Sequence, residues 1–421
     1  MQEQVLNSAM VPVSKIQEAR SQLSGVVTKT PYQKNYNLSE KYNCNIFLKR
    51  EDMQTVRSFK IRGAYNKISS LSPEEMSKGI VCASAGNHAQ GVAFACAHLK
   101  VKGKIFMPCP TPNQKINKVR QFGKEWVEII LVGDTFDDAY IAARQDEKIS
   151  QAIFIHPFDD VDVVAGQGTI AAEILDQATD PIDYLLVAVG GGGLISGVGS
   201  YFKVLSSKTK IIAVEAEGAA ALNVSLKENK VVRLDNIDTF ADGIAVKEIG
   251  HLNFEICKEV VDKSIVVAEG KICSTILKLY NDEAIVVEPA GAISVSALDT
   301  IADDIEGKNV AIIVCGGNND IQRTQEIKER ALLYEGKKHY FIINFPQRAG
   351  ALREFLDVLG PNDDIAHFQY TKKSSREQGP ALVGIELEDQ NDFDSLVDRM
   401  KRQSINFQHI NNNPMLFEML V

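Results

Sequence analysis

The chain has 421 residues, a formal net charge of -9 and a sequence pI of about 5.4. Hydrophobic residues make up 45% of it, enough apolar material for more than one core in a soluble globular protein. The acidic balance excludes a general positive field for nucleic acid, and the sequence has no apolar run of membrane length and no signal-peptide pattern. Seven scattered cysteines without a Cys-x-x-Cys pair indicate reduced thiols. We therefore expect a cytoplasmic protein that binds neither nucleic acid nor membranes.

Short apolar segments alternate with longer helical patterns through most of the chain. Strands are predicted at residues 104–107, 127–131, 184–189, 211–215 and 310–314. A helix is predicted over 113–122, with Thr111 as its cap and Pro112 at its first position. Thr135 predicts a second cap, for a helix over 136–148. The alternation predicts an α/β protein with parallel-rich, twisted sheets.

Beyond residue 335 the pattern changes to that of a small α+β unit. Strands are predicted at 339–344, 366–370, 381–387 and 407–410, and helices at 351–359 and 393–403. The order βαββαβ is typical of a ferredoxin-like unit. We interpret the basic cluster Lys372, Lys373 and Arg376 as a solvated hairpin rather than an anion site. Two domains are therefore predicted, a two-lobed α/β domain over 1–334 and a small domain over 335–421.

Four short motifs contain residues that could take part in catalysis or in ligand binding. The run Ser58-Phe59-Lys60-Ile61-Arg62-Gly63-Ala64 holds a lysine that, alone, could be an ordinary surface residue. The turn Ser84-Ala85-Gly86-Asn87-His88 opens a helix whose first N–H groups suit a carboxylate. A capped turn without a ligand stays open as the alternative.

The third motif is a run of glycines, Gly190, Gly191, Gly192 and Gly193, before Leu194. Backbone amides of such a loop can converge on a phosphate group, but no lysine completes a nucleoside-triphosphate loop. A loose dinucleotide pattern, with Glu215 or Glu217 as its acidic residue, stays open. The fourth motif, Cys315-Gly316-Gly317-Asn318-Asn319, could be an ordinary turn with a buried cysteine.

In this order the four motifs closely resemble the fold-type II pyridoxal-phosphate enzymes and, within them, the threonine dehydratase branch. The resemblance extends over nearly the whole chain and includes further motifs: Met107-Pro108, Thr111-Pro112, Lys115, Ala165-Gly166-Gln167-Gly168-Thr169 and Ala241-Asp242-Gly243-Ile244. It implies a catalytic domain over 1–334 with pyridoxal 5'-phosphate as cofactor.

The resemblance also implies roles for single residues. Lys60 would form the Schiff base and act as general base, Phe59 would lie against the cofactor ring, and Asn87 would bond its 3'-oxygen. Cys315 would face the ring nitrogen, and a neutral thiol there favours β-elimination over transamination. The remaining roles are phosphate binding by Gly190, Gly191, Gly192, Gly193 and Leu194, and substrate-carboxylate binding by Ser84, Gly86, Asn87 and His88. No metal site is predicted.

Two features narrow the implied reaction. Serine racemases of this family carry a serine where Ala85 stands, so racemisation is disfavoured. Segments 345–352 and 379–385 resemble the ACT-like regulatory domain of the biosynthetic branch, and only one such unit fits in the remaining residues. The resemblance therefore implies conversion of L-threonine to 2-oxobutanoate and ammonia in isoleucine biosynthesis, with L-serine as a side substrate. Isoleucine and valine would be effectors, and the protein a homodimer or homotetramer.

Four alternatives stay open at this point. The chain could be a catabolic serine/threonine dehydratase or a β-replacement enzyme with the same cofactor. It could be a nucleotide-dependent oxidoreductase built on the glycine loop. It could also be an amino-acid sensor whose catalytic domain is silent, although the intact Lys60, Asn87 and glycine loop argue against such decay.

Overall fold

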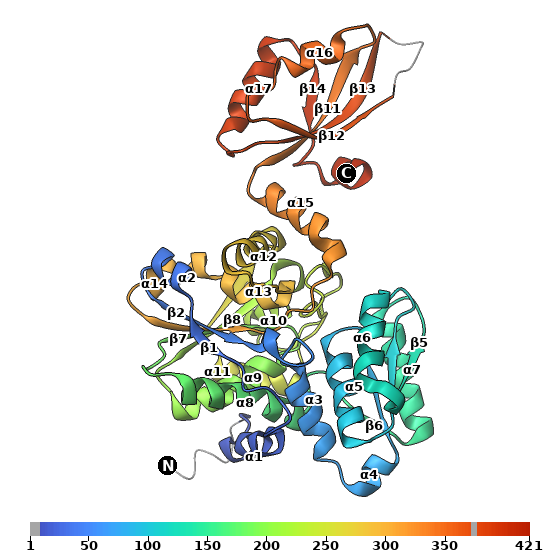
Figure 1. Ribbon diagram of the computed structural model, residues 1–421, viewed down its shortest axis with the longest axis vertical. Coiled ribbons are helices and arrows are strands. Elements are labelled where there is room, and N and C mark those ends of the chain that lie inside the picture. Colours follow the sequence, from blue (N-terminus) through green and yellow to red (C-terminus); the bar gives the residue numbers. More distant parts are fainter. Residues whose placement is uncertain (1–8, 372–376) are drawn as a thin grey trace. The chain divides into compact units, whose positions relative to one another are not determined.

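The computed structural model describes residues 9–371 and 377–421 (Figure 1). The chain divides into two compact units, Met1–Ile321 and Gln322–Val421. Among the described residues, the first unit contains two sheets and the second contains one. Helix α15 (Thr324–Tyr334) belongs to the second unit.

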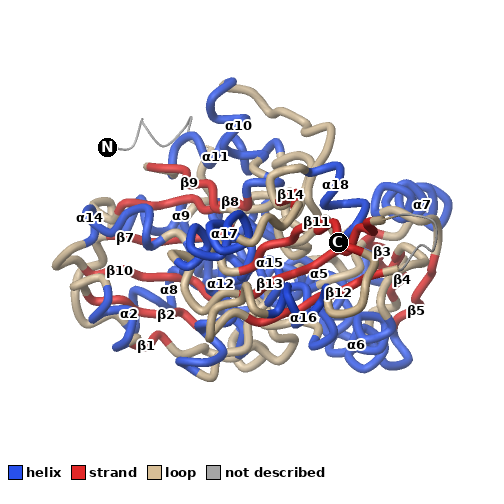
Figure 2. Tube along the Cα trace, turned by 90° about the horizontal axis from the view of Figure 1, so that it is seen from above, coloured by secondary structure: helices blue, strands red, loops and turns tan. Residues whose placement is uncertain are grey.

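A six-stranded sheet forms the centre of what we call the large lobe of the first unit. Its strands follow the order β1-β2-β10-β7-β8-β9, as Figure 2 shows, and all pairs except β1 with β2 are parallel. The strands are β1 (Tyr32–Lys34), β2 (Asn45–Arg50), β7 (Tyr184–Ala188), β8 (Lys210–Ala216), β9 (Lys263–Val267) and β10 (Asn309–Val314). Strands from the two ends of this unit, β2 and β10, are therefore neighbours.

The small lobe is built on a four-stranded parallel sheet of order β5-β4-β3-β6. Its strands are β3 (Ile80–Ala83), β4 (Gly103–Met107), β5 (Val127–Leu131) and β6 (Ile153–Phe154). Alternate side chains point to opposite faces. Cys82 and Ile105 lie in a core with α5 (Asn87–Leu99) and α6 (Asn113–Gly123), whereas Val81 and Phe106 lie in a core with α7 (Phe136–Ser150). In Figure 1 this lobe is cyan.

The other helices of the first unit are α1 (Val13–Leu23), α2 (Tyr36–Lys41), α3 (Lys60–Ser69), α4 (Pro73–Ser77), α8 (Val161–Gln177), α9 (Gly193–Leu205), α10 (Ala221–Glu228), α11 (His251–Val260), α12 (Glu269–Glu283), α13 (Pro289–Ser296) and α14 (Ala302–Ile305). Among them, α3 and α4 contribute residues to the small-lobe core. Helices α8 and α9 pack closely because glycines meet there. A Cβ on Gly197 would lie 2.3 Å from the Val164 carbonyl oxygen.

The second unit has the predicted ferredoxin-like order. Its antiparallel sheet runs β12-β13-β11-β14, and Phe341, Val383 and Phe355 belong to its core. Its elements after α15 are β11 (Lys338–Pro346), α16 (Ala351–Leu356), β12 (Asp364–Tyr370), β13 (Gln378–Glu386), α17 (Asp392–Arg402), β14 (Phe407–His409) and α18 (Pro414–Leu420). Helix α18 was not predicted. The basic cluster Lys372, Lys373 and Arg376 lies outside the described residues.

The predicted strands of the first unit are all present, with ends that differ by at most one residue. The Thr135 cap is confirmed, since its side chain accepts the Asp138 N–H. The cap predicted at Thr111 is wrong. Its hydroxyl donates to the Pro108 carbonyl at 2.7 Å, and Pro112 is the residue before the helix rather than its first position.

Candidate active site

Lys60 is the first residue of α3. Its Nζ donates to the Pro157 carbonyl at 2.9 Å and lies 5.3 Å from the centroid of the Phe59 ring. Burial lowers the pKa of Lys60 to about 8, although nearby Cys315 and Glu288 act to raise it. An amine with this pKa has a neutral, nucleophilic fraction near neutral pH, which imine formation requires.

Arg62 fixes the start of α3 through a buried charge network. Its guanidinium, fully buried, donates to Glu51 after β2 at 2.8 Å and to Glu173 of α8 at 2.7 Å. Lys49 Nζ donates to Glu173 at 2.6 Å. Two cations and two carboxylates therefore balance inside the large lobe, and they hold α3 against β2 and α8.

The turn after β10 lies beside Lys60. The Phe59 N–H donates to the Cys315 carbonyl at 3.1 Å, and Ser58 and Gly316 form a β-bridge. The Cys315 thiol donates to the Ala290 carbonyl at 3.1 Å. Burial raises the pKa of this thiol well above its ordinary value, so the thiol is neutral at neutral pH.

The asparagine turn joins β3 to α5. Ser84 Oγ accepts the Gly86 N–H at 3.2 Å, and α5 begins at Asn87, so N–H groups of its first turn have no helical acceptor. The His88 imidazole does not face this turn. Its Nε2 lies 3.0 Å from the Ile155 carbonyl oxygen, and burial lowers its pKa to about 3, which keeps it neutral.

Two residues to which the sequence analysis gave no role hold the Asn87 side chain. Asn87 Nδ2 donates to Glu288 Oε1 at 2.6 Å, and Asn318 Nδ2 donates to Asn87 Oδ1 at 2.7 Å. Burial raises the pKa of Glu288 to about 7. One signal could have identified Glu288, because it is the only charged residue in the stretch 284–298.

The glycine loop joins β7 to α9. Gly192 has φ +89°, a left-handed conformation that favours glycine. Asn253 Nδ2 donates to the Gly191 carbonyl at 2.8 Å and fixes the loop from α11. Leu194, in the first turn of α9, is buried.

Neighbouring groups leave no room for side chains on this loop. A Cβ on Gly190 would lie 2.7 Å from the Ile244 carbonyl oxygen. On Gly191 it would lie 2.2 Å from the Phe158 ring, and on Gly193 it would lie 2.9 Å from the Phe158 carbonyl oxygen. Phe158 directly follows Pro157, which accepts the Lys60 hydrogen bond. The segment Pro157–Phe158 therefore contacts both the glycine loop and Lys60.

Changing Gly191 to alanine is therefore expected to weaken cofactor binding about tenfold to a hundredfold, because overpacking costs about 1–3 kcal/mol. Titration of the apoenzyme with the cofactor, followed by absorbance, measures this change. Shortening Phe158 to alanine in the same chain should recover part of the lost affinity. Equal cofactor affinities of the wild type and the Gly191→Ala variant would contradict the predicted role of the loop.

The donor set fits pyridoxal 5'-phosphate. Lys60 supplies an amine for the aldehyde, and the glycine loop supplies backbone amides for the phosphate. Ser58 Oγ and Asn319 Oδ1 are buried polar atoms without a hydrogen-bond partner in the described parts of the chain, and both belong to the motifs around Lys60 and Cys315. Such atoms are suited to the polar groups of a bound ring.

The dinucleotide alternative fits less well. The Glu215 carboxylate accepts the backbone N–H groups of Leu222 and Asn223, each at 2.7 Å. The acidic residue that would bind a ribose is thus bonded to α10. Glu217 is exposed at the surface.

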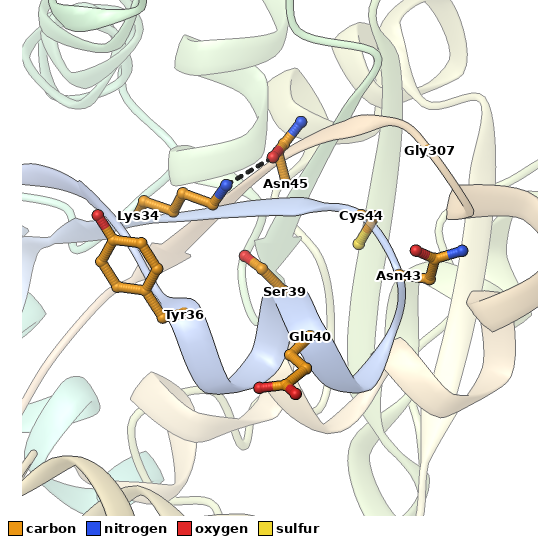
Figure 3. A pocket seen from close by; sticks show the side chains of 8 residues that line it. All are labelled: Lys34, Tyr36, Ser39, Glu40, Asn43, Cys44, Asn45 and Gly307. Atoms are coloured by element: carbon orange, nitrogen blue, oxygen red, sulfur yellow. Dashed lines mark hydrogen bonds between the residues drawn. The ribbon is translucent and has the colours of Figure 1, made fainter.

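A separate hollow of about 460 Å³ lies beside α2 and the start of β2 (Figure 3). None of the residues with a predicted role lines it. The lining residues are Lys34, Tyr36, Ser39, Glu40, Asn43, Cys44, Asn45 and Gly307. Within it Lys34 Nζ donates to Asn45 Oδ1 at 2.7 Å.

Residues 23–316 match the family of pyridoxal-phosphate dependent enzymes, and residues 329–420 match the C-terminal regulatory domain of threonine dehydratase. The chain is 56% identical over 415 residues to the L-threonine dehydratase biosynthetic IlvA of Bacillus subtilis, which covers 98% of both chains. A helix long and apolar enough to cross a membrane is not found among the residues that the structure describes.

Solved structures agree with these matches. The processed threonine deaminase isoform 2 of Solanum lycopersicum is 38% identical with a TM-score of 0.72, over 77% of this chain and 96% of that one. The serine racemase of Dictyostelium discoideum is 32% identical with a TM-score of 0.69, over 75% of this chain and 100% of that one. These likenesses, together with the site around Lys60, show that the chain belongs to the biosynthetic threonine dehydratase family of pyridoxal-phosphate-dependent enzymes.

Proposed function

We propose that the protein converts L-threonine to 2-oxobutanoate and ammonia, as a first step toward isoleucine, with slower turnover of L-serine. The observation that carries this proposal is the combination, in one chain, of the Lys60 site with a regulatory domain of the threonine dehydratase type. The stoichiometry is balanced, because the water lost with the β-hydroxyl is regained when the unsaturated amine hydrolyses.

The proposed roles are those that membership of this family implies for residues at these positions. Lys60 would hold the cofactor through Nζ and, when free, would accept the α-proton of the substrate at the same atom. Asn87 would donate to the 3'-oxygen of the cofactor, and Phe59 would lie against its ring. Cys315 would offer the ring nitrogen a neutral thiol. When bound, pyridoxal 5'-phosphate withdraws electrons from the substrate α-carbon.

Two groups of backbone donors complete the proposed site. The loop and the start of α9 would hold the cofactor phosphate, through Gly190, Gly191, Gly192, Gly193 and Leu194. The substrate carboxylate binds at the start of α5, where Ser84, Gly86, Asn87 and His88 contribute. For His88 the contribution is that of its backbone, since its imidazole bonds the Ile155 carbonyl.

Ala85 supports elimination over racemisation. A racemase needs a second base on the face of the substrate opposite Lys60, and alanine has no group that can move a proton. We therefore propose elimination rather than racemisation as the main reaction, despite the likeness to the serine racemase.

An assay of keto acid and ammonia tests this function. The holoenzyme should release 2-oxobutanoate and ammonia in equal amounts from threonine, and pyruvate more slowly from serine. Adding a thiol or indole should leave the keto-acid yield unchanged. Consumption of the added nucleophile in proportion to substrate would favour a β-replacement enzyme, and no keto acid from cofactor-loaded protein would overturn the proposal.

We propose isoleucine and valine as effectors of the second unit. Both polar atoms of the Gln347 side chain, and His367 Nε2, are buried without a hydrogen-bond partner in the described parts of this unit, which supports a polar ligand. Titrating isoleucine while following activity and mass by light scattering tests this role, as well as the proposed homodimer or homotetramer.

All seven cysteines are free thiols, which supports a reducing compartment such as the cytoplasm.

A further inference from the structure

Glu288 is a buried carboxyl group that the proposed reaction does not use. It precedes α13 and has 4% of its surface exposed. Its Oε1 accepts from Asn87 Nδ2 at 2.6 Å, and its carboxyl group also accepts the backbone N–H of Asn318. It therefore joins the asparagine turn to the turn after β10.

The hydrogen bonds that link Val56, Asn318, Asn87 and Glu288 have only one possible donor-to-acceptor direction. Asn318 Nδ2 donates to the Val56 carbonyl at 2.9 Å, and a carbonyl oxygen can only accept. The same Nδ2 donates to Asn87 Oδ1 at 2.7 Å, so the Asn87 amide must present Nδ2 to Glu288. One N–H of Asn87 remains after that bond, and it is the one available to the cofactor's 3'-oxygen.

The space around the Glu288 carboxyl group is tight. A Cβ on Gly316 would lie 2.0 Å from Glu288 Oε1 and 3.4 Å from Asn87 Nδ2. A Cβ on Gly243 would lie 3.5 Å from the same Oε1. The carboxyl group thus touches backbone on two sides, and a side chain of similar shape is required to keep Asn87 in place.

Four ionisable groups face Glu288 from the elements packed around it. They are Lys60 of α3, Cys315 after β10, Asp242 of the loop before α11, and Lys115 of α6, which pairs with Asp242. Burial, followed by the Asp242 charge, raises the pKa of Glu288 to about 7. The carboxyl group therefore changes charge near neutral pH, in electrostatic reach of the Lys60 nitrogen.

We propose that Glu288 is a positioning residue whose ionised carboxylate orients Asn87 and favours the protonated form of the nitrogen that links Lys60 to the cofactor. This role rests on the proposed function. A negative charge favours a nearby cation, so neutralising Glu288 should let that nitrogen lose its proton at a lower pH.

The test is a pH titration of the holoenzyme's visible absorption without substrate. In Glu288→Gln the alkaline midpoint should move down by about one pH unit, a roughly tenfold change in proton affinity. Glu288→Asp keeps the charge and should return the midpoint toward the wild-type value. Glu215→Gln is the matched control, because Glu215 is also buried with a pKa raised to about 7 but bonds only backbone of α10 among the described residues, so its midpoint should not move.

Two results would overturn this role. One is a Glu288→Gln titration that superimposes on the wild type. The other is an equal shift in the glutamine and aspartate variants, which would indicate packing rather than charge; circular dichroism confirms that the variants are folded. A wild-type protein that binds the cofactor without a visible band would instead overturn the proposed function itself.

Discussion

Changing Lys60 to alanine is expected to lower the rate of 2-oxobutanoate formation by at least about 10³-fold, because general-base catalysis alone contributes about 10²–10⁴-fold. The variant also loses the amine that holds the cofactor covalently. A continuous keto-acid assay with threonine measures the rate, and the absorption spectrum of the purified protein reports the covalent link.

The control is the exposed Lys227 in α10, where the same change should leave rate and spectrum as in the wild type. Retention of more than about a tenth of the rate in Lys60→Ala would show that another group takes the proton. Loss of both properties in the Lys227 variant would show that the assay reports general damage.

Changing Arg62 to leucine is expected to destabilise the first unit by about 3–5 kcal/mol, because Glu51 and Glu173 would remain buried with Lys49 as their cation. Although burial acts to raise it, the Arg62 guanidinium and then Lys49 hold the pKa of Glu51 below its usual range. Urea unfolding measures the effect. The fluorescence of Trp126, the only tryptophan of the chain, reports on the first unit alone.

Arg233→Ala is the matched control, since Arg233 pairs with Asp137 where both side chains are about half exposed. That change should cost less than about 1 kcal/mol. Equal unfolding midpoints for the two variants would mean that the buried network contributes no more than a surface ion pair.

The sequence allowed the strands, the ferredoxin-like order and the four motifs to be predicted, because all depend on local patterns. Phe59 and Cys315 are joined by a backbone hydrogen bond, and Asn318 of the Cys315 motif bonds both Asn87 and the Val56 carbonyl. The individual roles of the motif residues toward the cofactor stay predictions.

Residues that act through distant partners could not be found in the same way. Glu288, next to the start of α13 in the large lobe, meets Asn87 at the start of α5 in the small lobe, across about 200 residues of sequence. The Thr111 cap failed because the Pro108 carbonyl, three residues earlier, is a competing acceptor for the hydroxyl. The hydrogen bond of the His88 imidazole to the Ile155 carbonyl could not be predicted, because the position of Ile155 depends on β6 packing against β3.

The adjacency of β2 and β10 has a consequence for biosynthesis on the ribosome. The small-lobe sheet is complete once residue 154 has emerged, whereas the central pairing of the large sheet requires residue 314. Lys60 is translated early but has its Cys315 neighbour only after the whole first unit has been synthesised. On one side β2 can pair early with β1, but its other edge must wait for β10 through most of translation. This open edge exposes the nascent chain to aggregation and to chaperone binding.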